Sequence, residues 1–163
     1  MRLLASNIRQ FALKTFELDE TDWSLLSEVQ SNARTSTAEI GRRVGLTAPA
    51  TAERLRRLEE NGVIRGYHAA IDVEKIGRPI FAFIRLRFNR GRYDAFERLV
   101  KKSTAILECH HITGEDCFIV KAAVASMAEL ERLAAALSHF GPPATSVVYS
   151  TAITRRNILP PAD

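Results

Sequence analysis

The fold of the N-terminal half is decided by residues 36–62, which read STAEIGRRVGLTAPATAERLRRLEENG. Ser36 stands three residues before Glu39, and this spacing is typical of a capping box, in which each side chain binds the other residue's backbone amide. The box predicts a short helix over about 37–44. Gly45 ends that helix, because glycine takes the left-handed conformation of a helix C-terminus without strain.

Two longer helices flank the short one. Thr47 caps a helix that runs to about Asn61, and Pro49 falls in its first turn, where no backbone donor is needed. Upstream, Asp19 precedes an apolar series at helical spacing, which predicts a first helix over about 20–31. A short helix, a tight turn and a longer basic helix make up a helix-turn-helix.

The outward face of the third helix is the candidate DNA-binding surface. Its inner stripe of Thr51, Leu55 and Leu58 leaves small residues and arginines on the opposite side. Small side chains let a helix N-terminus approach base edges, while arginines bind bases or phosphates. The candidate DNA-binding residues are Thr47, Ala48, Pro49, Ala50, Thr51, Arg54, Arg56, Arg57 and, from the second helix, Arg42. A structural three-helix subdomain with charged outer faces explains the helical spacing equally well.

Charge and composition narrow the class of protein. The net charge of +4 permits an anionic partner without requiring one, and residues 34–65 hold seven arginines against four glutamates. The 46% apolar content suffices for a packed core, and no apolar run is long enough to span a membrane, so we expect a cytoplasmic protein with no membrane partner. Residues 62–72, GVIRGYHAAID, are typical of a wing and a strand that leads out of the domain.

The periodicity changes after residue 79. Apolar and β-branched runs predict strands, and two amphipathic runs predict helices, the second of them capped at Ser126. The predicted order is strand 80–88, helix 93–102, strand 105–113, strand 117–125, a helix ending before 141–143, and strand 145–153. This α+β plan is the ferredoxin-like βαββαβ fold, whose helices cover one face of the sheet. The first strand is apolar on both faces over its first half, so we expect a second subunit to cover the other face.

The cysteines and histidines do not suggest a metal site. Cys109 and Cys117 have neither a zinc-binding spacing nor the pattern of a disulfide framework, and we expect both to be reduced thiols. His110 and His111 are adjacent, so they would point to opposite faces of a strand. We expect no metal and no cofactor.

Residues 18–72 closely resemble the DNA-binding domain of the Lrp/AsnC family of feast/famine regulators. The resemblance is carried by segments that match the family's motifs: LDETD (18–22), QSNAR (30–34), EIGRRVGL (39–46), ERLRRLE (53–59) and GVIRGY (62–67). The second half resembles the ligand-sensing domain of that family, and ITGEDCF (112–118) falls where its members carry a glycine-containing turn. The similarity extends over about residues 18–155.

The resemblance implies a sequence-specific transcription regulator rather than an enzyme. Members of the family form homodimers through the α/β domain, often associate further into tetramers to octamers, bind double-stranded DNA, and bind small effectors, commonly amino acids, near that turn. Carried over to this chain, the effector site is Thr113, Gly114, Glu115, Asp116 and Cys117, with Thr145 and Ser146 as a further edge. Many members place an aspartate where Cys117 stands, so their leucine-like or asparagine-like specificity does not carry over.

The predicted organisation has five parts: an N-terminal extension (1–17), a winged helix-turn-helix domain (18–72), a linker (73–79), an effector-binding and oligomerisation domain (80–155), and a tail (156–163). The extension is compatible with a short amphipathic helix, with a frayed terminus, or with a translation start placed too far upstream. Two other functions remain open at this stage. One is an architectural DNA-binding protein without an effector, and the other is a ferredoxin-like enzyme that uses a cysteine nucleophile.

Overall fold

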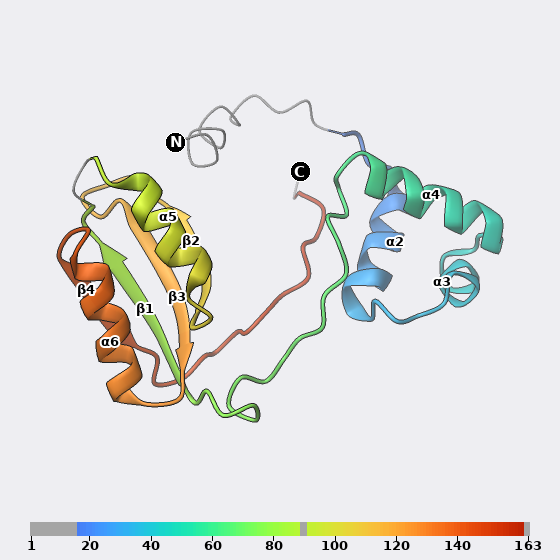
Figure 1. The fold of residues 1–163 in the computed structure, drawn as a ribbon. Helices are drawn as coiled ribbons and strands as arrows, with labels where there is room; N and C mark the ends of the chain where they lie inside the picture. Colours follow the sequence, from blue (N-terminus) through green and yellow to red (C-terminus); the bar gives the residue numbers. More distant parts are fainter. Residues whose placement is uncertain (1–15, 89–90, 162–163) are drawn as a thin grey trace. The chain divides into compact units, whose positions relative to one another are not determined.

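The computed structural model describes residues 16–88 and 91–161, which form parts of two compact units (Figure 1). The helical unit contains residues 16–70 together with 153–161 from the other end of the chain, and the sheet unit contains the described residues between 71 and 152. Most of the predicted N-terminal helix lies outside the described residues.

The helical unit holds three helices at the predicted places: α2 (Glu20–Ser31), α3 (Thr37–Val44) and α4 (Ala48–Glu60). Each begins at the predicted N-cap, because Asp19, Ser36 and Thr47 accept hydrogen bonds from the amides three residues on. The α3 helix ends at Gly45, whose φ of 74° is the left-handed conformation expected there.

The three helices surround one small apolar core. Its buried side chains come from all three helices: Leu25, Leu26, Val29, Ile40, Leu55 and Leu58. Gly41 permits the tight turn between α3 and α4, because a Cβ at this position would lie 2.7 Å from the carbonyl oxygen of Leu46 and from the Thr51 hydroxyl. The short α3 and the sharp turn therefore depend on a residue without a side chain.

The wing differs from the prediction. Residues 63–72 belong to neither a helix nor a strand. Val63 and Ile64 donate their amides to the carbonyl of Leu58, which turns the chain back along α4. The described residues of the helical unit contain no strand, so this segment has no strand there to pair with.

The sheet unit has the predicted ferredoxin-like order: β1 (Ile80–Leu86), α5 (Tyr93–Lys102), β2 (Ile106–His111), β3 (Phe118–Val124), α6 (Met127–Ser138) and β4 (Pro143–Val147). Its four antiparallel strands lie side by side in the order β2-β3-β1-β4 (Figure 1).

The fourth strand starts earlier and ends earlier than predicted. The strand β4 pairs with β1 from Pro143 opposite Leu86 to Val147 opposite Ala82, and a last bond joins the amide of Val148 to the carbonyl of Phe81. Because β1 itself begins at Ile80, residues after Val148 have no partner on that side. The predicted strand over 145–153 therefore stops at Val147.

The helices α5 and α6 pack on one face of the sheet. Alternate residues of β1 and β3 are fully buried there, and they contact Phe96 of α5 and Leu137 of α6 within one core cluster. On the opposite face Phe83 is 37% exposed, and Phe81 meets it edge to face with ring centroids 5.8 Å apart. The prediction of a one-sided sheet with an apolar open face is confirmed.

No helix among the described residues is long and apolar enough to cross a membrane.

Candidate DNA-binding surface and effector site

The exposed start of α4 is the part of the helix-turn-helix that is free to meet another molecule. Thr47, Ala48, Pro49 and Ala50 are all exposed, and the Thr47 hydroxyl accepts from the Ala50 amide. This turn presents small side chains and the positive end of the helix dipole, both of which suit the approach of a phosphate backbone or a base edge. The structure brings these four predicted residues together on one surface.

Thr51 does not share that surface. Its side chain is fully buried, and its hydroxyl donates to the carbonyl of Thr47 at 2.9 Å. Thr51 faces the core as part of the inner stripe, so its inclusion among candidate DNA contacts was inconsistent with the helical pattern. Its side chain stabilises the start of α4 instead.

Arg54 and Arg57 are held by a buried carboxylate. Asp22 in α2 has no exposed surface, and its two oxygens lie 2.9 Å from Nη1 of Arg54 and 2.8 Å from Nη2 of Arg57. Arg54 also pairs with Asp19 at 2.6 Å, and the guanidinium of Arg57 lies 5.4 Å from the ring centroid of Phe16. The two arginines therefore tie α4 to the start of α2, a role that helical spacing alone did not indicate.

The same contacts shift the ionisation of the surrounding groups. The hydrogen bond from Arg54 lowers the pKa of Asp19, and the amide of Asp22 adds to this effect. In return, Asp19 and then Asp22 raise the pKa of Arg54. The charged forms are thus favoured in the folded unit, and Arg54 is a permanent cation in this network.

Arg56 and Arg42 are more exposed, and each is paired with a neighbour on its own helix. Arg56 binds Glu53 at 2.6 Å and also pairs with Glu60, and Arg42 pairs with Glu39. Exposed pairs of this kind contribute little to stability and exchange readily for another anion. Arg56 and Arg42 therefore remain the predicted arginines with the greatest freedom to bind phosphate.

The predicted effector residues form a single tight turn between β2 and β3. The turn is closed by the amide of Ile112, which donates to the carbonyl of Cys117 at 2.9 Å, and the amide of Cys117 donates to Leu86 of β1 at 3.0 Å. Gly114 has a φ of 115°, and nothing lies within 4 Å of the place where a Cβ would be. The backbone at Gly114 is therefore open to a close approach.

Arg85 of β1 and Arg87, which follows the end of that strand, lie beside this turn, and neither was among the predicted site residues. Arg85 Nη1 is 3.7 Å from the carboxylate of Asp116, and Arg87 forms an ion pair with Glu115. The signal was available, because Arg85 and Arg87 alternate with core residues on a strand that must pair with β3. The turn thus presents both signs of charge within a few residues.

Thr145 and Ser146 are not part of the turn. Both are exposed on β4, and β1 lies between β4 and the strand that carries the turn. Ser146 is opposite Phe83 and Thr145 is opposite Ile84, so the two side chains point to opposite faces of the sheet. Only Ser146 shares the open face with Arg85.

The cysteines do not resemble a nucleophilic site. Burial raises the pKa of Cys109 to about 11, so its thiol is protonated at neutral pH and is a poor nucleophile. Cys117 lies half-buried beside the turn, and both thiols are free. Among the described residues, no group of three or more metal-binding side chains is close enough together to hold a metal ion.

The open face of the sheet combines an apolar centre with charged neighbours. Lys121 of β3 lies over the Phe81 ring, 5.4 Å from its centroid, and binds Glu108 of β2 at 2.6 Å. Lys121, and to a smaller extent His110, lower the pKa of Glu108, which favours the charged form of its carboxylate. An apolar patch with a charged rim is the usual composition of a protein–protein interface.

Comparisons with known proteins agree with this arrangement. Residues 18–59 match the AsnC-type helix-turn-helix domain, and residues 81–158 match the Lrp/AsnC ligand binding domain. The leucine-responsive regulatory proteins of Escherichia coli and Salmonella typhimurium are each 35% identical over 120 residues, which cover 72% of this chain and 73% of theirs.

Solved structures show the same fold. The LrpC protein of B. subtilis aligns with a TM-score of 0.81 at 27% identity, covering 86% of this chain and all of that one. A transcriptional regulator of Neisseria meningitidis in complex with L-Met aligns with a TM-score of 0.81 at 28% identity, over 87% of this chain and 96% of that one. The chain belongs to the Lrp/AsnC family of DNA-binding transcription regulators and carries that family's helix-turn-helix and ligand-binding domains.

Proposed function

We propose that this protein is an effector-responsive regulator that binds DNA through the exposed start of α4 and senses an amino acid at the turn Thr113–Cys117. The observation that carries the proposal is the composition of this turn. An amino acid has one carboxylate and one ammonium group, and the turn offers a partner for each.

The ammonium group is matched by Asp116, which is 30% exposed and only loosely held by Arg85 at 3.7 Å. The carboxylate is matched by Arg85, Arg87 and the open backbone at Gly114. In the effector-free turn, the acids and the arginines neutralise one another. A zwitterionic ligand can replace those pairs without leaving a charge unpaired, which favours an amino acid over a simple anion.

Thr113, Gly114 and Glu115 of the turn are exposed in a single chain, so we propose that a second copy completes the site. The open face around Phe81 and Phe83 is the interface through which two copies dimerise, and further association brings turns of different dimers together. The relatives support such a ligand, since one is named for leucine and another was solved with L-Met.

At the DNA, we propose that Thr47, Ala48, Pro49 and Ala50 approach the major groove while Arg56 and Arg42 bind phosphates. Arg54 and Arg57 then position α4 rather than read bases, because Asp22 already binds both guanidinium groups. A twofold dimer presents two such helices, so the operator is approximately palindromic.

A thermal-shift screen of the twenty amino acids tests the sensing role. An effector at a hundred times its dissociation constant stabilises the protein by roughly 2.7 kcal/mol. We expect one or a few amino acids to raise the melting temperature of the wild type and not of Asp116→Ala. A shift of equal size in Asp116→Ala would place the site elsewhere. If no amino acid gives a shift while the protein binds DNA, an architectural role without an effector becomes the better account.

A further inference from the structure

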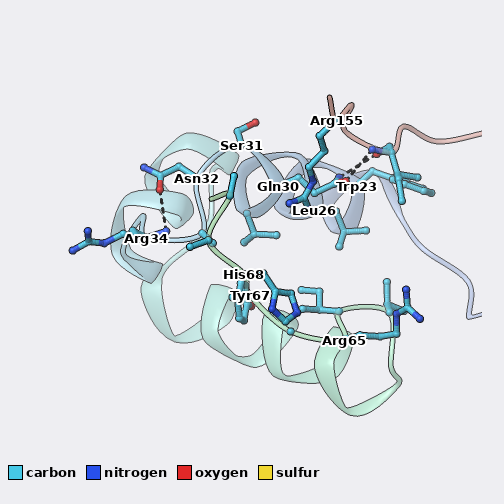
Figure 2. Close-up of a pocket in the computed structure, with 18 of the residues that line it drawn as sticks. Trp23, Leu26, Gln30, Ser31, Asn32, Arg34, Arg65, Tyr67, His68 and Arg155 are labelled. Atoms are coloured by element: carbon cyan, nitrogen blue, oxygen red, sulfur yellow. Dashed lines mark hydrogen bonds between the residues drawn. The ribbon is translucent and has the colours of Figure 1, made fainter. Parts of the chain in front are cut away.

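The helical unit has an apolar groove at the end of α2 that the DNA-binding role does not use. Figure 2 shows this groove, whose volume is about 930 Å³ and whose floor includes Trp23, Leu26 and Ile64. Arg34, Arg65 and Arg155 lie along it, and none of the described residues that line it is acidic. Arg155 and Ile158 of this lining come from the C-terminal end of the chain, and the other lining residues lie between Leu18 and Ala70.

The C-terminal tail is attached here through its backbone. The amide of Ile158 donates to Oε1 of Gln30 at 2.9 Å, and Nε2 of Gln30 donates back to the carbonyl of Ile158 at 3.1 Å (Figure 2). Next to this pair, Nδ2 of Asn157 donates to the Ser31 hydroxyl at 3.1 Å. The Gln30 amide thus binds the tail as a neighbouring strand would, by one donor and one acceptor.

The attachment depends on extended backbone rather than on apolar side chains. Ile158 is 73% exposed and Leu159 is 67% exposed, so neither side chain is buried in the groove. Three hydrogen bonds in water-accessible surroundings contribute little net stability, which makes the contact reversible. A reversible contact between distant parts of the chain is suited to a detachable tether.

We propose that residues 155–159 are a strap that docks on Gln30 and Ser31 and gives the helical unit a second attachment to the sheet unit. The first attachment is the linker between Ala70 and Ile80, and the second runs from Val147 to Ile158. Each has about ten residues and spans at most roughly 35 Å. A unit held at two separate points swings less than a unit held at one.

The strap docks on α2, the helix that positions α4. The docking residues are at the C-terminal end of α2, and Asp22 near its N-terminal end binds Arg54 and Arg57 of α4. Seven residues separate the strap from β4, which pairs with the end of β1 that contacts the turn at Cys117. The proposal does not require that an amino acid binds there, because docking is a property of the chain itself.

Trypsin cleavage after Arg155 and Arg156 measures docking in the full-length protein. We expect Gln30→Leu, which removes both amide bonds at similar volume, to speed this cleavage about tenfold, whereas Ser24→Ala on the exposed side of α2 leaves the rate unchanged. Ile158→Pro removes the tail's own donor and should act like Gln30→Leu without altering α2, α3 or α4. Cleavage after Arg132 of α6 monitors the integrity of the fold.

Nuclear spin relaxation gives a second readout. With the strap released by Ile158→Pro, the amides of α2 to α4 should show a shorter rotational correlation time relative to those of β1 to β4. Equal tail cleavage in the wild type, Gln30→Leu and Ile158→Pro would overturn the proposal. It would also be overturned if mixing Gln30→Leu with a chain truncated after Ala152 restored protection, because the tail would then dock between copies.

Discussion

The carboxylate of Asp22 lies 2.9 Å from the guanidinium of Arg54 and has no exposed surface. An ion pair to a buried carboxylate therefore joins α4 to α2. Arg57 completes the arrangement at 2.8 Å. Removing one partner from a buried pair costs more than the pair itself contributes, because the remaining charge loses its counter-ion.

Asp22→Ala should therefore destabilise the helical unit by about 2 kcal/mol, less than a fully buried pair because both arginines reach solvent. Trp23 is the single tryptophan and packs against the core of this unit, so its fluorescence reports urea unfolding of the unit alone. The matched change Arg56→Ala breaks only exposed pairs and should shift stability by less than about 0.5 kcal/mol. Equal effects of the two variants would contradict the anchoring role.

An acidic side chain at the start of α4 separates DNA binding from folding. Ala50→Glu places a negative charge near the helix N-terminus, where the dipole favours it, so stability should be unchanged or slightly raised. The same charge repels phosphate, and the affinity for DNA should fall at least tenfold in a gel-shift or anisotropy titration at fixed salt. Ala128→Glu, in the exposed first turn of α6, is the control. DNA affinity that survives Ala50→Glu would exclude this surface.

A charge on the open face of the sheet should prevent dimerisation. Phe83→Glu puts a carboxylate in the centre of the apolar patch, where it would be desolvated on association. Sedimentation equilibrium should show a shift from dimer or larger species to monomer. Met127→Glu changes an exposed apolar residue of similar size on α6 and should leave the assembly intact. An unchanged mass for Phe83→Glu would mean that this face is not the interface.

Acid should weaken the helical unit partly through Asp19. Arg54 holds the pKa of Asp19 below its ordinary value, so the ionised carboxylate favours the folded state. This contribution is complete above the unfolded carboxyl pKa of about 4 and is lost as the pH falls through the lower folded value. Asn is also a good N-cap, so Asp19→Asn keeps the cap and removes the titration. Urea midpoints from pH 7 to 2.5 should fall more steeply for the wild type; parallel curves would contradict the assignment.

The sequence predicts the helices and most strands because their signals are local. Asp19, Ser36 and Thr47 act on amides three residues away, and Gly45 stops α3 through its own φ. The end of β4 depends instead on where β1 begins, nearly seventy residues earlier in the chain. Local patterns carry no information about such a distant partner, so that boundary was wrong.

The candidate DNA-binding surface and effector site were also predicted where their signals are local, and missed where they depend on a distant partner. The start of α4 and the turn at Gly114 follow from caps and motifs, whereas the roles of Arg54 and Arg57 depend on Asp22, which is 32 and 35 residues away. Periodicity placed both arginines away from the core but could not identify their partner. The alternation of Arg85 and Arg87 with core residues could have indicated which face they share, but their partners Asp116 and Glu115 follow only from the pairing of β1 with β3.

The central claim is that an amino acid bound at the turn changes the affinity of the protein for DNA. The most direct measurement is the dissociation constant for an operator fragment with and without the amino acid that stabilises the wild type, repeated with Asp116→Ala. For the wild type, we expect the amino acid to change this dissociation constant about 5- to 150-fold, the usual range of such coupling. For Asp116→Ala, we expect no change on adding the amino acid. The effector-free affinity of this variant should stay near that of the wild type. A dissociation constant that the amino acid leaves unaltered in the wild type, or alters equally in Asp116→Ala, would contradict it.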